Sequence, residues 1–223
     1  MITIQDVGYR YPGQDGFALR NLNMEIADGS YVAILGPNAS GKSTLARLLN
    51  ALLIPSEGSI CVDGNTIDNT IRPDSPLLAQ IRCAVGMVFQ NPENQVIGDT
   101  VGQDVAFGPE NLGLPTEEIR SRVDQALGLM GLDGLRNRNP LDLSGGQLQR
   151  LAIAGALALK SRYLILDESL CMLDRQSKTE VLDVLKRLNE EEKLGIILIT
   201  HDRRDCRDAR LIYELKEGKL IQC

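Results

Sequence analysis

Residues 36–44, GPNASGKST, follow an apolar β-type run at Tyr31–Leu35 and precede a helical run at Thr44–Leu49. The stretch fits the pattern G-x-x-x-x-G-K-[ST], and a strand–loop–helix context is the one in which backbone N–H groups close around a polyphosphate. Lys42 is expected to reach the terminal phosphates, and the Ser43 hydroxyl to ligate Mg²⁺. The alternative is a glycine-rich turn with a surface lysine, and the matching flanks on both sides argue against it. The predicted phosphate-binding residues are Gly36, Pro37, Asn38, Ala39, Ser40, Gly41, Lys42, Ser43 and Thr44.

Length and composition limit the class of protein. The chain has 223 residues, of which 43% are hydrophobic and 24% charged, as in an ordinary globular domain. Its net charge of −6 argues against non-specific binding of nucleic acid. No apolar run approaches the length of a membrane-spanning helix, about 18–20 residues, and no secretory signal opens the chain. The five cysteines form no C-x-x-C pair, so we expect reduced thiols in a cytosolic protein, without a zinc site or a disulfide framework.

The order of apolar and polar segments predicts an α/β fold. The region Met1–Ile26 is rich in strand-forming residues, with a turn around residues 12–16. Short runs of branched apolar residues predict buried strands at Tyr31–Leu35, Val85–Phe89, Tyr163–Leu166 and Ile196–Thr200. We therefore expect one domain over residues 1–223, with an α/β core in 1–90 and 161–223 and an inserted helical subdomain at 91–160.

Helix signals mark three further segments. One amphipathic helix is expected to begin near Pro115 and to end at Gly131. Another carries Val181, Leu182, Leu185 and Leu188, with the glutamates 190–192 as its solvated end. Asn91-Pro92 predicts an N-cap with proline at the first helical position. It should start a short helix over residues 93–97, ended by Gly98.

Leu143-Ser144-Gly145-Gly146-Gln147 predicts a second anion-binding helix start. Ser144 is a good N-cap, and the two glycines leave backbone N–H groups open to an anion. One nucleotide does not easily need two such sites from one domain, so we expect each nucleotide to lie between two chains. An ordinary capped helix after a glycine turn is the alternative. The residues expected to contact the partner chain's nucleotide are Ser144, Gly145, Gly146 and Gln147.

Polar side chains follow three of the predicted strands. Asp167 and Glu168 end the strand at 163–166; Asp167 is expected to hold Mg²⁺, and Glu168 to orient or deprotonate the attacking water. Gln90 follows another strand, where an amide can touch both Mg²⁺ and water. His201, the single histidine, ends a third strand and can donate a hydrogen bond to the terminal phosphate. The predicted metal ligands are therefore Ser43, Gln90 and Asp167, and the predicted catalytic residues Lys42, Gln90, Glu168 and His201.

An aromatic residue near the start of the chain is expected to stack on adenine. Tyr11 is our candidate, and Tyr9, two residues away on the same face of a strand, is the rival.

With these residues assembled, the chain resembles the ATP-binding subunits of ATP-binding-cassette (ABC) transporters along essentially its whole length. GPNASGKST resembles the Walker A motif, LSGGQ the family signature, Ile165–Glu168 the Walker B motif with the catalytic glutamate, and Leu173-Asp174 the D-loop. Gln90 is similar to the Q-loop glutamine and His201 to the switch histidine. The resemblance implies a P-loop NTPase core with an N-terminal antiparallel β subdomain and an inserted helical subdomain. It also implies ATP with Mg²⁺, a second ATPase subunit, homologous or identical, and a transmembrane partner.

A narrower resemblance is to the ATPases of energy-coupling-factor (ECF) transporters. Residues 89–95, FQNPENQ, are close to the F-Q-N-P-D-N-Q of that group. This resemblance implies uptake of a vitamin or a transition-metal ion, and a location on the cytoplasmic face of the membrane. It also implies a transmembrane coupling subunit bound near Gln90–Ile97, and through it a substrate-binding membrane subunit. Residues 169–175, SLCMLDR, depart from the usual pattern, with Arg175 in place of proline. Another ABC importer or exporter and a soluble ATP-gated switch protein are the alternatives.

Overall fold

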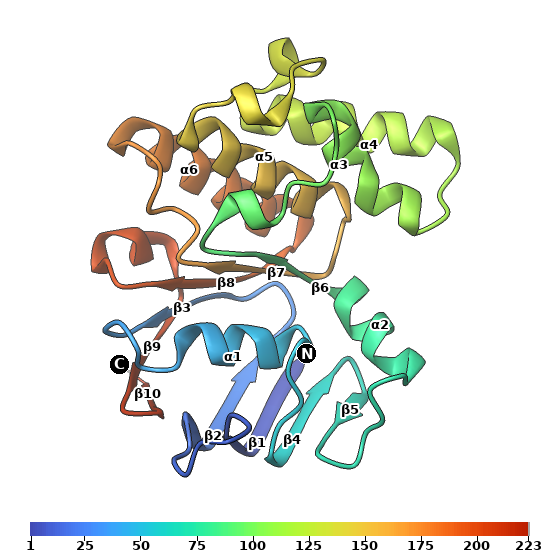
Figure 1. The fold of residues 1–223 in the computed structure, drawn as a ribbon. Helices are drawn as coiled ribbons and strands as arrows, with labels where there is room; N and C mark the ends of the chain where they lie inside the picture. The colour runs from blue at the N-terminus through green and yellow to red at the C-terminus, as the bar shows by residue number, and fades with distance from the viewer. Residues whose placement is uncertain (223) are drawn as a thin grey trace.

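The computed structural model describes residues 1–222 and contains two β-sheets (Figure 1). The smaller sheet is antiparallel, with the strand order β2-β1-β4-β5. Its strands are β1 (Ile2–Tyr9), β2 (Leu19–Ile26), β4 (Glu57–Val62) and β5 (Asn65–Ile67). The strand-rich start predicted for the chain is thus confirmed.

The larger sheet has six strands in the order β10-β9-β3-β8-β7-β6, and all its neighbours are parallel except β10 and β9. Its strands are β3 (Tyr31–Leu35), β6 (Val85–Val88), β7 (Tyr163–Asp167), β8 (Gly195–Thr200), β9 (Leu211–Lys216) and β10 (Lys219–Gln222). The four predicted buried strands are among them. Since parallel strands end at one edge, the segments that follow β3, β6, β7 and β8 meet there.

Residues 1–222 form six α-helices. They are α1 (Lys42–Leu49), α2 (Pro76–Ala84), α3 (Val101–Asn111), α4 (Thr116–Met130), α5 (Gly145–Ala158) and α6 (Arg175–Glu192). Figure 1 shows α1 between the two sheets, and α5 and α6 on the opposite face of the larger sheet, with α3 and α4 beyond them. The described residues also form four 3-10 turns: η1 (Pro92–Asn94), η2 (Asp133–Leu135), η3 (Pro140–Asp142) and η4 (Arg203–Asp208).

Alternation along the central strands divides the core in two. Ile165 of β7 packs with Leu45 of α1 and the small sheet, whereas its neighbours Leu164 and Leu166 pack with α5 and α6. Successive side chains of a strand point to opposite faces, so a strand covered on both sides is apolar throughout. This arrangement holds the carboxyl ends of the strands rigidly between two layers.

The helix predicted over residues 93–97 is wrong in extent. Asn91 does cap the turn, by accepting from the Glu93 N–H, but the turn is a 3-10 helix that ends at Asn94. The Gln95 side chain turns back to β6: its Oε1 accepts from the Phe89 N–H at 2.7 Å. The next backbone donors, of residues 97 and 98, go to the Asp104 carboxylate at 2.7 and 3.0 Å. Side-chain hydrogen bonds, instead of the backbone hydrogen bonds of a helix, therefore hold both ends of the segment 89–98.

Further differences concern boundaries and two helices, α2 and α3, that were not predicted separately. Helix α1 begins at Lys42, two residues earlier than predicted, and β6 ends at Val88 because Phe89 bonds to Gln95. Helix α2 was not predicted, although Ser75 caps it and Pro76 is its first residue. Cys61, Cys83, Cys171 and Cys206 are free thiols, and Cys223 lies outside the described residues.

Candidate functional site

The loop between β3 and α1 is built to leave backbone donors free. Gly41 is the N-cap of α1 in a left-handed conformation (φ 104°), and it supplies no side-chain cap. The first N–H groups of a helix have no partner within the helix, so those of α1 can bind an anion. Gly36 allows the loop to pass close to β9, since a Cβ there would lie 2.4 Å from the Leu215 carbonyl oxygen.

The Lys42 ammonium lies inside this loop with its side chain 3% exposed. It donates to the carbonyl oxygens of Gly36 and Pro37 at 2.9 and 2.8 Å, and lies 2.9 Å from Oε1 of Glu168. An ammonium has three donors, so all three are engaged. A phosphate oxygen that approaches Lys42 must therefore compete with the Glu168 carboxylate.

Glu168 stands between the lysine and the histidine. Its other oxygen, Oε2, lies 3.4 Å from Nδ1 of His201. The residue follows β7 with φ 48°, a left-handed conformation that costs a non-glycine residue about 1–2 kcal/mol, and its N–H donates to the Ile199 carbonyl at 2.9 Å. The strand ends thus bring Lys42, Glu168 and His201 together, as the sequence predicted for one site.

Asp167 is a buried carboxylate with an orphaned oxygen. It is 2% exposed, and its Oδ1 finds no hydrogen-bond partner among residues 1–222. Burial raises the pKa of Asp167, and a hydrogen bond from Ser43 acts in the opposite direction. Ser43 also lines the cleft described below, together with Gln90. These oxygen donors fit Mg²⁺, a hard cation that needs few protein ligands beside phosphates and water.

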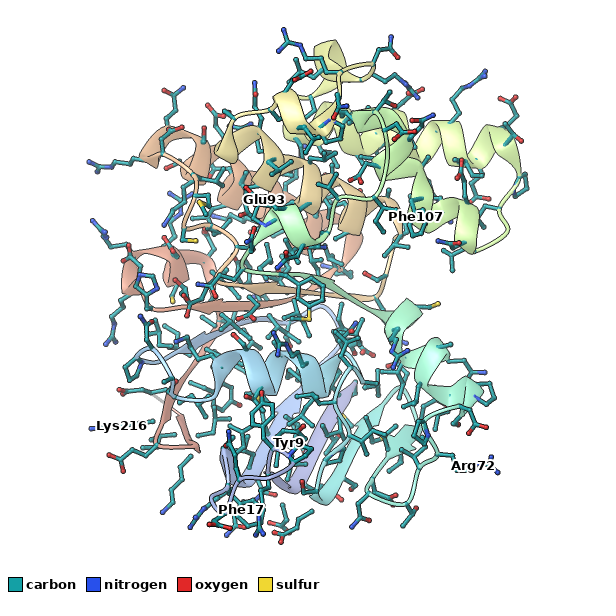
Figure 2. The ribbon with its side chains drawn as sticks, in the orientation of Figure 1. Tyr9, Phe17, Arg72, Glu93, Phe107 and Lys216 are labelled. Carbon is teal, nitrogen blue, oxygen red and sulfur yellow. The ribbon has the colours of Figure 1, made fainter. Side chains whose placement is uncertain are left out.

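The two tyrosines are separated by the fold. Tyr9 is buried in the core between α1 and the small sheet (Figure 2), whereas Tyr11 lines the cleft and exchanges a hydrogen bond with the Thr44 hydroxyl at 3.0 Å. The rings meet edge to face, with centroids 4.9 Å apart. Of the two, Tyr11 is the one that lines the cleft beside the phosphate loop.

One open cleft of about 640 Å³ joins most of these groups. Its lining residues are Tyr11, Gln14, Ala18, Asn38, Ala39, Gly41, Lys42, Ser43, Thr44, Gln90 and Glu168. Gln14 and Ala18 were not predicted; their position next to Tyr11 is the only signal in the sequence. His201 lines an adjoining cavity of about 120 Å³ that Glu168 shares.

The segment 144–147 lines no part of that cleft as the described residues form it. Ser144 and Gln147 form a capping box at the start of α5: the Ser144 N–H donates to Gln147 Oε1 at 3.0 Å, and the Gln147 N–H to Ser144 Oγ at 3.4 Å. The Gln147 side chain is therefore engaged within its own chain. A Cβ on Gly145 would meet no described atom within 4 Å, so this helix start faces open space.

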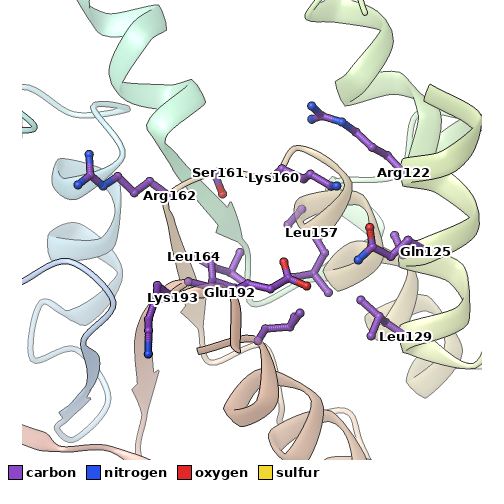
Figure 3. Close-up of a pocket in the computed structure, with 14 residues that line it drawn as sticks. Arg122, Gln125, Leu129, Leu157, Lys160, Ser161, Arg162, Leu164, Glu192 and Lys193 are labelled. Carbon is purple, nitrogen blue, oxygen red and sulfur yellow. The ribbon is translucent and has the colours of Figure 1, made fainter. Parts of the chain in front are cut away.

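A second cavity, of about 250 Å³, lies away from these residues (Figure 3). Its walls come from α4, the end of α5, the start of β7 and the end of α6; among them are Gln125, Leu157, Lys160 and Glu192. It lies near the amino end of β7, whereas Asp167 and Glu168 lie at the carboxyl end. None of the predicted site residues lines it.

A phosphate loop, a buried strand-end aspartate and a strand-end glutamate on a parallel sheet define the chain as a P-loop ATPase. The sequence model of the ABC transporter family matches residues 19–170. The energy-coupling factor transporter ATP-binding protein EcfA of Syntrophomonas wolfei is 48% identical over 221 residues, covering 99% of this chain and 79% of that protein. The cobalt import ATP-binding protein CbiO of Syntrophus aciditrophicus is 44% identical over 223 residues, covering 100% and 77%. The chain belongs to the ABC transporter family, as an ATP-hydrolysing subunit of the energy-coupling factor type.

Two solved structures share the fold. CbiO1 from Clostridium perfringens, described as part of the ABC transporter complex CbiONQ, superposes with a TM-score of 0.87 at 38% identity, covering 99% of this chain and 86% of that one. A dimeric ATP-binding cassette in a post-hydrolysis state with ADP and Pi gives a TM-score of 0.89 at 31% identity, covering 100% and 98%. The predicted fold class, with its antiparallel β part and helical part, is confirmed.

Proposed function

We propose that this chain hydrolyses ATP at an interface between two ATPase subunits and uses the cycle to drive uptake through a membrane partner. The observation that carries the proposal is the Lys42–Glu168–His201 cluster, in which Glu168 lines both the cleft of Lys42 and the adjoining cavity of His201. In this scheme Tyr11 stacks on adenine, and the loop 36–44 holds the phosphates. Residues 1–223 act as one nucleotide-binding domain, with residues 91–160 as its helical part.

The ion pair between Lys42 and Glu168 suggests how the Glu168 carboxylate becomes available as the general base. A terminal phosphate that takes the place of Glu168 at Lys42 frees the carboxylate to orient or deprotonate water. His201 and Lys42 then stabilise the charge that develops on the transferred phosphoryl group. Ser43, Asp167 and Gln90 would hold Mg²⁺, which when bound neutralises charge on the phosphate oxygens. Gln90 also lies at the start of the segment 89–98, so changes in the cleft can reach that segment.

Ser144, Gly145 and Gly146 are assigned to the nucleotide of the second subunit, since they lie outside the cleft of their own chain. To test this, Gly145→Asp is placed in the Glu168→Gln background, where ATP-bound dimers should accumulate. The aspartate fits the open space of the isolated chain but sets a negative charge against the partner's terminal phosphate. We expect ATP-dependent dimerisation, measured by sedimentation, to weaken at least about tenfold.

Gly155→Asp is the matched control, because it lies on the same helix and a Cβ there also meets no described atom within 4 Å. It should leave dimerisation unchanged. ATP binding by each isolated chain should stay at the level of the parent. Dimers of normal affinity with Gly145→Asp would remove the 144–147 segment from the shared site.

Two exposed apolar side chains in and near the segment 89–98 suggest where the membrane subunit binds. Ile97 is 62% exposed, and Phe107 of α3 is 42% exposed (Figure 2). Residues 97 and 98 are anchored to Asp104, one turn before Phe107, so a partner that grips Ile97 also moves α3. A coupling helix with its own apolar face would fill this surface in the helix-in-groove manner.

No helix within residues 1–222 has the length and apolar character required to cross a bilayer. Attachment to the cytoplasmic face of a membrane would therefore come through this surface. The partner contacts the substrate-binding membrane subunit, and a vitamin or a transition-metal ion is the proposed cargo, by analogy with the cobalt import protein. The second ATPase subunit is a copy of this chain or a homologue. Nucleic acid has no place in the scheme.

We expect Ile97→Asp to weaken recovery of a polytopic membrane protein with the tagged chain by at least about tenfold, because it buries a charge in an apolar contact. The measurement is quantitative mass spectrometry after gentle solubilisation of native membranes. Leu52→Asp, at an exposed apolar residue in the turn after α1, is the control and should keep the partner. Equal recovery with both variants would move the binding surface elsewhere, and recovery of the unmodified chain only from the soluble fraction would overturn the transporter role.

A further inference from the structure

Two lysine–aspartate pairs join α6 to the turn η4. Lys178 Nζ lies 3.1 Å from Asp205 Oδ2, and Lys186 Nζ lies 3.2 Å from Asp208 Oδ1. The first pair is the more buried: the side chains are 22% and 5% exposed, against 48% and 11% in the second. The two pairs share their helix, their turn and their chemistry, but differ in what surrounds them.

The inner pair belongs to a network on both sides of His201. Asp205 Oδ2 also accepts a hydrogen bond from the Thr200 hydroxyl at 3.1 Å. The same hydroxyl accepts from the Asp202 N–H at 3.0 Å. The residues before and after His201 in the chain are therefore both held by a network centred on the Asp205 carboxylate.

The network reaches the wall of the catalytic cluster. Lys178 and Asp205 line the small cavity of about 120 Å³ that Glu168 and His201 also line. The outer pair, Lys186 with Asp208, does not line it. Thus only one of the two pairs shares a cavity with the groups assigned to the chemistry.

The lysine connects this cavity to the start of α6. Asp174 caps that helix by accepting from the N–H groups of Gln176 and Ser177 at 2.9 and 3.0 Å, and Lys178 lies one turn further on. A displacement of the Asp174 segment therefore carries Lys178 with it, because the first turn of the helix moves as a unit.

We propose that Lys178 and Asp205 are positioning residues for ATP hydrolysis. They fix the position of the His201 side chain relative to Glu168, and they link that position to the first turn of α6. This inference rests on the roles proposed above for Glu168 and His201. His201 is half exposed and contacts Glu168 at 3.4 Å, so its own packing constrains it little. The buried carboxylate supplies the missing constraint through the backbone of residues 200–202.

Burial favours this role over a purely stabilising one. An exposed ion pair contributes little to stability, and a buried pair is often replaceable by apolar residues without loss of stability. A buried pair does fix one geometry, because its hydrogen bonds form at one separation and orientation. The inner pair therefore holds a position, whereas the outer pair serves as a natural comparison.

The test measures kcat and the Kd for ATP of Lys178→Met, Asp205→Asn and the double variant. Each should lower kcat about tenfold or more, because misplacement of a catalytic group by a fraction of an ångström has such effects. The Kd for ATP should stay within about twofold, since neither residue lines the nucleotide cleft. The double variant should lose no more than either single variant, because the residues act as a unit.

Two controls separate positioning from stability. Lys186→Met removes the outer pair and should leave kcat within about twofold of the parent. Lys178→Arg keeps the charge and the donors, and should recover most of the kcat lost in Lys178→Met. The double variant leaves no unpaired buried charge, so it reports on position even if a single variant folds poorly.

Parental kcat in the folded double variant would overturn the inference, and so would equal losses in Lys178→Met and Lys186→Met. Failure of the proposed function looks different: Glu168→Gln and His201→Ala would then both retain turnover. In that case the catalytic roles proposed for Glu168 and His201 are wrong, independently of the result for Lys178.

Discussion

Glu168→Gln is expected to lower ATP turnover by about 10²–10⁴-fold while leaving ATP binding intact. The amide cannot take a proton from water, and general-base catalysis contributes about that factor. The neutral side chain also relieves Lys42 of a partner that competes with phosphate, so ATP affinity should be equal or higher. Single-turnover hydrolysis and equilibrium binding of ATP measure the two effects separately.

Glu217→Gln is the matched control for this variant. Glu217 is exposed in the turn between β9 and β10, and has φ 49° against 48° for Glu168. Glu217→Gln thus makes the same substitution, at a residue with the same backbone conformation, outside the candidate site. ATP turnover should be unaffected. Turnover near the parental rate in Glu168→Gln would exclude Glu168 as the base.

Lys42→Met is expected to weaken ATP binding about 10–100-fold, the contribution of one or two hydrogen bonds between charged groups. The methionine fills a similar volume in the loop, but leaves the carbonyls of Gly36 and Pro37 without their donor. Glu168, 11% exposed, would then lose its ammonium partner and keep the contact of 3.4 Å with His201. Isothermal titration with ATP and with ADP gives the change in affinity.

Lys160→Met is the comparison for the lysine variant, because Lys160 lines the second cavity and not the nucleotide cleft. Its affinity for ATP should match that of the parent. If Lys42→Met bound ATP with unchanged affinity, the loop 36–44 would have to hold the phosphates by backbone groups alone.

Sequence reasoning located the strand ends well because their signals are local and redundant. Each buried strand is a short apolar run, and the runs at 163–166 and 196–200 lead directly into polar residues, Asp167 and His201. The parallel order of β3, β8, β7 and β6 then brings those residues to one edge without further information. The phosphate loop was recognisable for the same reason: its glycines and its flanks agree.

The parts that were missed depend on contacts between distant residues. No local pattern shows that Gln95 bonds back to Phe89 instead of continuing a helix. The capping box of Ser144 and Gln147, in contrast, has a local S-x-x-Q signal that the prediction did not use. The pairing of Lys178 with Asp205 spans 27 positions, and lysine and aspartate are common surface residues. Such side-chain bonds compete with helix and strand ladders, and only the folded chain decides between them.

The departures at residues 169–175 leave the start of α6 intact. Arg175 occupies the first helical position, where proline is favoured but not required, and Asp174 retains its capping bonds. Cys171 and Met172 lie exposed in this segment. The unusual sequence therefore alters what this surface presents, not how the helix begins.

The side-chain hydrogen bonds at both ends of the segment 89–98 affect how the segment can move. A loop that is anchored at only one end can change its conformation locally, so a movement at one end need not reach the other. Here the Gln95 bond to Phe89 and the Asp104 bonds to residues 97 and 98 brace the segment against β6 on one side and α3 on the other. In the proposed scheme, a displacement of Gln90 would therefore be passed on to Ile97 through these hydrogen bonds.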